Sequence, residues 1–240
     1  MGPGGWFKGF LKTAAASALY AVVHSLLASG RAKHAATRAI GERNRNALYR
    51  PFYLLQSAGT MLVLVAYIRR QPGKLIVNAR GLASVPFRLV QMAGVWWAIV
   101  AAREVRFSEI LGIRPFVSLL RGDEQIAPEP EAQGPAPQGN ELRICGPFRL
   151  SRHPLNLAPL PILWFNPRLS TNLLAYNLVS LVYLVLGSLN EECRLETRYG
   201  QAYRDYQRST VPFFFPTWTL SRVEQTCPSN NSKMSRPDLP

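Results

Sequence analysis

Long uncharged apolar runs alternate with short basic segments along this chain. Three of the runs, Thr13–Gly30, Pro51–Ile68 and Leu169–Asn190, contain no formal charge at all. An uncharged apolar run of about 18 residues or more is long enough to cross the hydrocarbon core of a bilayer. The pattern therefore excludes an ordinary soluble globule and predicts membrane-spanning helices. The first run is too long for the core of a signal peptide, so we interpret it as a retained span.

Two further apolar stretches complete the pattern. Gly81–Ala102 is interrupted only by Arg88, and we expect it to span with Arg88 reaching the headgroups. Leu155–Pro167 contains three prolines and reaches only roughly 20 Å as a helix, which predicts a kinked or partly re-entrant helix. It would form a hairpin with Leu169–Asn190. The predicted fold is all-α: a polytopic membrane helical bundle with about five transmembrane helices.

The charge of the chain is unevenly distributed, with 28 Lys and Arg against 14 Asp and Glu. If residues 31–50, 103–153 and 191–240 share one side of the membrane, that side carries 20 of the 28 basic residues. The positive-inside bias then places this side and the C-terminus in the cytoplasm. The basic segments flank apolar runs and are explained by topology and contact with anionic lipids, so we expect no nucleic-acid partner.

The domain organisation is simple. We expect one membrane domain over residues 1–220, with a disordered loop at residues 121–140 and a disordered polar tail at residues 221–240, because both segments are too polar and Pro-rich to form a packed core. Cys145, Cys193 and Cys227 show no metal-ligand spacing. We interpret them as reduced thiols, and we expect no metal site and find no sign of a protein partner.

A polar cluster is predicted on the cytoplasmic side, where the short proline-rich stretch begins and the last run ends. Arg152-His153-Pro154 leads into the short stretch, and Glu191-Glu192 follows the last run. Carboxylates can accept hydrogen bonds from hydroxyls or amines of a ligand, and Arg and His side chains can donate them. The same residues could instead only cap a helix at the interface. Residue types alone leave both interpretations open.

The order of these motifs resembles a known family. Residues 146–156 read G-P-F-R-L-S-R-H-P-L-N, and after the predicted hairpin residues 191–212 read E-E-C-R-L-E-T-R-Y-G-Q-A-Y-R-D-Y-Q-R-S-T-V-P. This order resembles the isoprenylcysteine carboxyl methyltransferase family of integral membrane methyltransferases, with its G-[PV]-Y-R-x-x-R-H-P-x-Y and E-E-x-x-L…[FY]-G-x-x-Y-x-x-Y…V-P pattern. The likeness covers about residues 140–216.

The N-terminal half narrows the resemblance. Residues 24–29 read H-S-L-L-A-S, residues 49–53 Y-R-P-F-Y, residues 111–114 L-G-I-R and residues 164–167 W-F-N-P. These motifs resemble the NnrU-like and methanethiol S-methyltransferase branch of the family.

The resemblance implies that S-adenosylmethionine binds in a cytoplasmic pocket under the hairpin, while the methyl acceptor arrives from the bilayer. Transferred by motif, the cofactor-binding residues are Leu142, Arg143, Phe148, Arg152, His153, Pro154, Leu155, Asn156, Glu191 and Glu192.

The chain departs from the family pattern at several positions. Asn156 and Phe148 stand where the family has Tyr, and one extra residue precedes Val211-Pro212. Gly187 stands four residues before Glu191, where the carboxyl methyltransferases have an Arg suited to a substrate carboxylate. A carboxylate acceptor is therefore not expected here, and we expect a small or lipophilic thiol.

Methyl transfer to a thiol benefits from a group that takes up its proton, because a free thiol is mostly protonated at neutral pH. His24, inside the first span, and His153 are the candidate catalytic residues. The sequence predicts an S-adenosylmethionine-dependent methyltransferase in a membrane, most simply a bacterial inner membrane. Two alternatives stay open: an NADPH-dependent membrane reductase of the sterol-reductase type, and a non-catalytic NnrU-like membrane protein.

Overall fold

A computed structural model describes residues 3–105, 111–127, 142, 144–209 and 211–215. In this part of the chain, four helices are long and apolar enough to cross a membrane: Gly4–Ala28, Glu42–Arg70, Gly81–Glu104 and Thr171–Tyr199. The protein is an integral membrane protein, and its fold is the predicted all-α polytopic bundle. Most of the predicted disordered loop and all of the predicted tail lie outside the described residues.

The elements follow one another as helices. They are α1 (Pro3–Ala28), α2 (Gly30–Ile40), α3 (Glu42–Arg70), the 3-10 turn η1 (Gly81–Ser84), α4 (Val85–Glu104), α6 (Ile113–Arg121), the 3-10 turn η2 (Gly146–Arg149), α7 (Pro154–Leu157), α8 (Pro159–Trp164), α9 (Thr171–Tyr199) and α10 (Gln201–Arg208).

The predicted spans overlap α1, α3, α4 and α9 over most of their length, but three of these helices run well beyond the apolar runs that predicted them. α3 starts at Glu42, nine residues before the run that begins at Pro51, and α9 continues to Tyr199. Polar residues at the ends of a spanning helix keep their backbone hydrogen bonds while their side chains reach the headgroup region. The helices are therefore longer than the apolar runs.

The proline-rich stretch forms two short helices. α7 and α8 each begin with a proline in the first turn, where its missing N–H is not needed. Pro159 and Pro161 cannot donate the hydrogen bonds of a continuous helix. The predicted kinked, short helix is thus observed as α7 and α8, and it forms the expected hairpin with α9.

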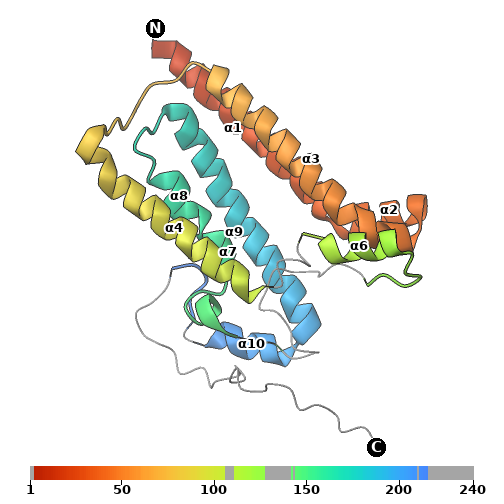
Figure 1. The fold of residues 1–240 in the computed structure, drawn as a ribbon. Coiled ribbons are helices and arrows are strands. Elements are labelled where there is room, and N and C mark those ends of the chain that lie inside the picture. Colours follow the sequence, from red (N-terminus) through yellow and green to blue (C-terminus); the bar gives the residue numbers. More distant parts are fainter. Residues whose placement is uncertain (1–2, 106–110, 128–141, 143, 210, 216–240) are drawn as a thin grey trace, which may run out of the picture.

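The helices form two groups, one of α1 and α3 and one of α4, α7, α8 and α9, and the two groups meet where α1 packs against α9 (Figure 1). α1 lies between α3 and α9, and α4 packs on α7 and α8. The short helices therefore occupy the space between α4 and α9.

Backbone hydrogen bonds tie together segments that the charge pattern places on one side of the membrane. The amides of Ile76 and Ala79 donate to the carbonyls of Leu169 and Pro167, each at 2.8 Å. At the other end, α2, α6 and α10 lie near the cytoplasmic ends expected for α1, α4 and α9 (Figure 1). The structure thus groups the connecting segments as the topology requires.

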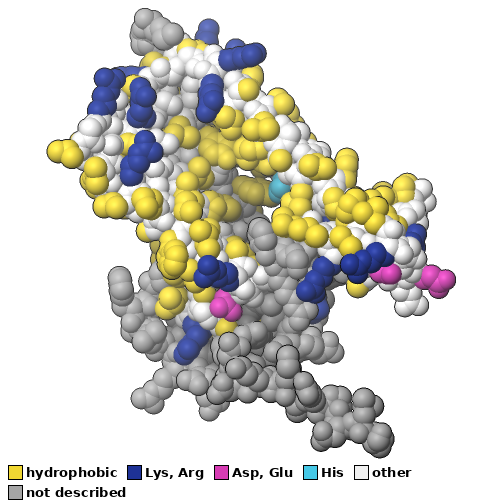
Figure 2. Space-filling view, viewed as in Figure 1, with side chains coloured by type: hydrophobic (Ala, Val, Ile, Leu, Met, Phe, Trp, Pro, Cys, Tyr) yellow, Lys and Arg dark blue, Asp and Glu magenta, His cyan; other side chains and the backbone are white. Residues whose placement is uncertain are grey.

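The outer surface of the long helices is apolar. Figure 2 shows hydrophobic side chains covering the middle of the visible face, with Lys and Arg gathered toward its ends. Leu55 is 75% exposed and Leu62 71% exposed, which is costly in water and suits contact with lipid tails.

One prediction about the cysteines is wrong. Cys145 is disulfide-bonded, although the spacing of the three cysteines along the sequence gave no sign of a pair. Sequence spacing does not report distance in the fold. Cys193 is a free, exposed thiol.

Candidate functional site

The site begins at the turn that the Gly-Pro-Phe-Arg motif forms. Gly146 has φ +53°, a conformation that favours glycine, and a Cβ on it would lie 2.7 Å from Oε1 of Glu104 at the end of α4. The turn η2 follows, and the backbone amide of Arg152 then donates to the carbonyl of Pro212 at 2.9 Å. The motif therefore fixes Arg152 and His153 against the end of α4 and the segment after α10.

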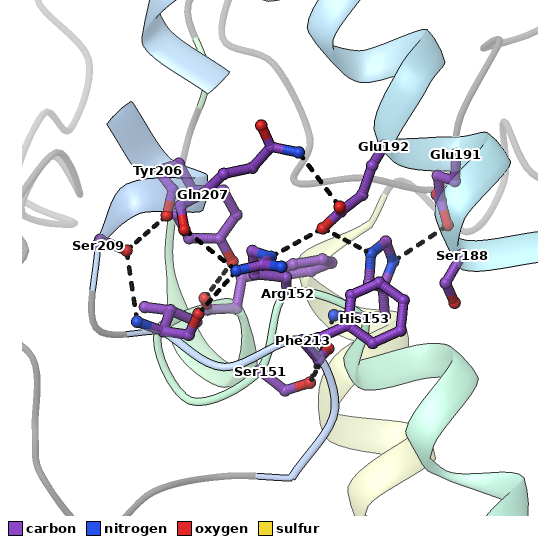
Figure 3. A network of polar contacts seen from close by, with 12 residues as sticks. Ser151, Arg152, His153, Ser188, Glu191, Glu192, Tyr206, Gln207, Ser209 and Phe213 are labelled. Carbon is purple, nitrogen blue, oxygen red and sulfur yellow. Dashed lines mark hydrogen bonds and ion pairs between the residues drawn. The ribbon is translucent and has the colours of Figure 1, made fainter. Parts of the chain in front are cut away.

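Arg152 joins three parts of the chain (Figure 3). Its Nε donates to Oε1 of Glu192 at 2.8 Å, and its Nη1 donates to the carbonyls of Gln207 and Val211, each at 3.2 Å. Both charged side chains are largely buried. The ring of Phe213 lies under the guanidinium, 5.7 Å from its carbon. Arg152 thus holds the C-terminal segment against α9.

His153 lies between the two carboxylates. Its Nε2 is 3.2 Å from Oε1 of Glu192 and its Nδ1 is 3.5 Å from Oε2 of Glu191. Burial lowers the pKa of His153, but the hydrogen bonds to Glu191 and Glu192 and their negative charges outweigh it, so its pKa is raised above the ordinary 6.5. An imidazolium donates from both nitrogens, which is what two flanking carboxylates require.

Glu191 keeps one carboxylate oxygen without a partner. Its Oε2 accepts from the amide of Asn156 at 3.4 Å, and the same amide donates to Oγ of Ser188 at 2.8 Å. Its Oε1 is buried and has no hydrogen-bond partner among the described residues, in a residue that is only 7% exposed. A buried carboxylate oxygen left in this state is costly unless a ligand or water donates to it.

An apolar wall lies next to this polar network. Phe148, only 2% exposed, packs with Tyr203 and Tyr206, and Leu142 and Leu155 pack against the same cluster. The hydroxyl of Tyr206 donates to the carbonyl of Phe148, whereas the buried hydroxyl of Tyr203 has no partner among the described residues. Burial raises the pKa of both tyrosines, so both stay neutral. The site thus combines carboxylates with an aromatic and aliphatic surface.

The structure brings most of the predicted cofactor-binding residues together. The polar network holds Arg152, His153, Asn156, Glu191 and Glu192. The apolar wall holds Leu142, Phe148 and Leu155. Pro154 is buried beside them, and its carbonyl accepts from Nε1 of Trp97 at 2.9 Å. Arg143 lies outside the described residues.

His24 belongs to a separate cluster inside the bundle. Its Nε2 is 2.6 Å from the hydroxyl of Tyr53 and its Nδ1 is 2.9 Å from Oγ of Ser57, both on α3. The ring of Tyr20 stacks on it, and the ring of Tyr183 on α9 meets it edge-on. Tyr183 precedes Glu191 by eight residues, or roughly 12 Å along α9, so the structure does not bring the two candidate catalytic histidines together.

Several residues of the site escaped the sequence reasoning. Ser188 contacts Asn156, and the amide of Gln207 donates to Oε2 of Glu192 at 3.1 Å. The ring of Phe213 lies 4.8 Å from that of His153. Ser188 could have been found, because it precedes Glu191 by three residues on one helix face. Gln207 and Phe213 carry no such signal, because α10 must first fold back onto α9.

Metal coordination finds no support in the described part of the chain. No group of three or more His, Cys, Asp or Glu side chains is close enough there to hold a metal ion.

The comparisons with known proteins agree with the motifs. Methanethiol S-methyltransferase 2 of Bradyrhizobium diazoefficiens is 25% identical to this chain over 198 residues, which cover 82% of the chain and 70% of that relative. This chain is similar to methanethiol S-methyltransferases. The methanethiol S-methyltransferase of Pseudomonas deceptionensis is also 25% identical, over 46% of the chain and 38% of its own length. The predicted resemblance to this branch is thereby confirmed.

No protein-family model and no solved structure matches the chain.

Proposed function

We propose that this protein transfers a methyl group from S-adenosylmethionine to a small or lipophilic thiol at the membrane. The observation that carries the proposal is the unpartnered Oε1 of Glu191, buried beside an aromatic and aliphatic wall. The two similar proteins named as methanethiol S-methyltransferases support the same reaction class.

The residues present fit S-adenosylmethionine. Its ammonium group can donate to Oε1 of Glu191, and its apolar surfaces suit the wall of Phe148, Leu142 and Leu155. When bound, it supplies a methyl group on a positively charged sulfur. NADPH carries no ammonium group that could donate to Oε1 of Glu191. This carboxylate therefore favours S-adenosylmethionine over the cofactor of the reductase alternative.

At both positions where the family has Tyr, the residue of this chain makes defined contacts in the site. Asn156 occupies the position of a family Tyr, yet its amide donates to Oε2 of Glu191. Phe148 occupies the other, and it is a core residue whose carbonyl accepts a hydrogen bond from Tyr206. These contacts argue against a site that has lost its ligand, as the non-catalytic alternative requires.

The two histidines take different parts in the proposal. His153 is a positioning residue, because it holds both carboxylates, which raise its pKa. His24 is the proposed catalytic residue that receives the proton of the thiol. Both of its ring nitrogens bond to hydroxyls, those of Tyr53 and Ser57, and a hydroxyl can pass a proton on because it both donates and accepts.

The proposed setting is the inner membrane of a bacterium, with the C-terminus and the site of Glu191 in the cytoplasm. The distribution of basic residues supports this orientation, and both similar proteins come from bacteria.

Calorimetric titration of S-adenosylmethionine into the protein in nanodiscs tests the proposal. We expect micromolar binding, weakened about 10-fold or more by Glu191→Gln, because a charge-assisted hydrogen bond is worth roughly 1.5–3 kcal/mol. Glu196→Gln is the matched control: Glu196 lies on the same helix, its side chain is 39% exposed, and it pairs only with Arg204 among the described contacts. It should bind like the wild type.

The same titration distinguishes the alternatives. Binding of NADPH without S-adenosylmethionine would assign the protein to the reductases. Binding of neither, in protein that unfolds cooperatively, would favour a non-catalytic membrane protein.

A further inference from the structure

A cavity lies inside the bundle, away from Glu191. It has a volume of about 190 Å³ and lies between α1, α3, α8 and α9; its wall includes Ser17, Tyr20, His24, Met61, Leu163 and Tyr183. Among the described residues, no Lys, Arg, Asp or Glu lines it. Figure 2 shows that the apolar face of the molecule is hollowed between its two groups of helices. A ligand here would be uncharged and would arrive through lipid.

Ser17 gives this cavity an unused hydrogen-bonding group. The residue is 3% exposed, and its Oγ has no hydrogen-bond partner among the described residues. It lies on the same face of α1 as Ala21 and His24, four and seven residues further on. A buried hydroxyl without a partner costs stability. A ligand with one donor or acceptor would offset that cost.

The volume limits the size of the ligand. A dry apolar cavity of about 150 Å³ is known to hold a molecule as large as benzene. A cavity of about 190 Å³ therefore admits a molecule of a few carbon atoms with one polar group. A long isoprenoid or acyl chain exceeds it.

The cavity borders the proposed cofactor site through α9. Leu184 lines the cavity, Ser188 follows one turn later and contacts Asn156, and Glu191 follows after roughly 10 Å. Leu184 also packs in the apolar cluster that contains Phe213, whose ring contacts His153. The cavity wall thus continues along α9 toward the residues that surround Glu191.

We infer that this cavity binds the methyl acceptor, a short-chain uncharged thiol that enters from the bilayer. The inference rests on the proposed function and specifies its substrate class. Ser17 contacts the ligand, His24 faces it, and Ala21 and Leu163 limit its length.

A series of straight-chain thiols from ethanethiol to 1-octanethiol tests the size limit. Ala21→Leu fills the cavity and should raise KM for 1-butanethiol about tenfold, since a methylene-sized change in an apolar pocket is worth 10-fold or more. Leu163→Ala enlarges it and should raise kcat/KM for 1-octanethiol relative to ethanethiol about tenfold. Ala18→Leu is the matched control, because Ala18 is exposed on the same helix; it should leave the series unchanged.

Photolabelling gives a readout that is independent of turnover. A short alkyl thioether carrying a diazirine should label residues of α1, α8 and α9 around the cavity, in protein without cofactor. Excess methyl propyl sulfide should compete with the label, and Ala21→Leu should abolish it.

The outcomes separate this inference from the proposed function. If the wild type binds S-adenosylmethionine and methylates thiols, but the cavity variants keep its chain-length series and labelling, the acceptor binds elsewhere and the inference is wrong. If the wild type neither binds S-adenosylmethionine nor methylates any thiol, the proposed function itself fails, whatever the labelling shows.

Discussion

The two adjacent glutamates have different surroundings although their sequence context is nearly the same. Glu192 is neutralised by Arg152 and also bonds to His153 and Gln207. Glu191 is held through Oε2 alone and keeps Oε1 free of described partners. Glu192 therefore has a structural role, and Glu191 is the carboxylate that we propose for ligand binding.

The Arg152–Glu192 pair should dominate the stability of this end of the molecule. Arg152→Ala removes the closest cation from the buried Glu192, leaves it with His153, and frees the carbonyls of Gln207 and Val211. Breaking a buried pair in this way costs roughly 3–5 kcal/mol. Unfolding in mixed SDS micelles measures it, and Arg204→Ala, at an exposed pair with Glu196, should cost less than about 1 kcal/mol. Equal losses in the two variants would contradict this account.

The protonation of His153 predicts a pH dependence. Because its pKa is raised in the folded protein, its stabilising effect is complete below about pH 6.5, its ordinary pKa, and is lost as the pH rises through the raised value. The melting temperature should therefore fall above pH 6.5, and His153→Gln should flatten that fall. His34→Gln, at an exposed position, is the control and should keep the wild-type slope. A wild-type slope in His153→Gln would disprove the assignment.

Among the elements, α9 carries the largest share of the site. Ser170 caps its N-terminus by accepting from the amide of Leu173 at 3.2 Å, and Gly200, with φ +56°, separates it from α10. α10 can then fold back and place Gln207 next to Glu192. The length of α9 thus joins the membrane interior to the surface site.

Two glycines in long helices should respond in opposite ways to alanine. A Cβ on Gly187 in α9 meets nothing within 4 Å, so Gly187→Ala should stabilise the protein by about 1 kcal/mol, the helix-propensity difference. A Cβ on Gly94 in α4 would lie 2.7 Å from Cγ of Pro161 in α8. Gly94→Ala should therefore destabilise the protein by about 1–3 kcal/mol. SDS titration of both variants checks the signs, and two changes of the same sign would contradict the packing described.

The sequence is sufficient to place the elements, because a span needs a long charge-free run and a proline-rich run cannot form a long helix. Thr13–Gly30 and Leu169–Asn190 therefore predict α1 and α9 well. The sequence also suffices to predict that the Arg-His-Pro and Glu-Glu motifs lie close together. The residues that contact these motifs cannot be predicted from the sequence in the same way. Gln207, Phe213 and the disulfide of Cys145 depend on how distant segments fold back. A cavity such as that at Ser17 arises from packing alone.

At the scale of the whole molecule, the connecting segments form two ends with different numbers of basic residues. The end with residues 72–79 and 167–171 is tied by backbone hydrogen bonds, and the opposite end holds α2, α6, α10 and the site. The proposed orientation places the second end in the cytoplasm.

Thiol labelling tests this orientation. Cys193 is free and exposed at the end of α9 that the proposal places in the cytoplasm, so a membrane-impermeant maleimide should label it in inverted vesicles and not in intact spheroplasts. A cysteine can be placed at the opposite end by Arg80→Cys in a protein that also carries Cys193→Ser. This variant should be labelled in intact spheroplasts and not in inverted vesicles. Labelling of Cys193 from outside would overturn the orientation.

The pairing of α1 with α9 has a consequence for how the protein is made. α1 leaves the ribosome well before α9, the helix on which it packs. Until then the buried hydroxyls of Thr13 and Ser17 face lipid or the insertion machinery. Contacts between such distant parts of a chain form slowly. Assembly of this bundle is therefore completed only after translation has passed α9, and truncated chains that end before Thr171 should be degraded rather than accumulate.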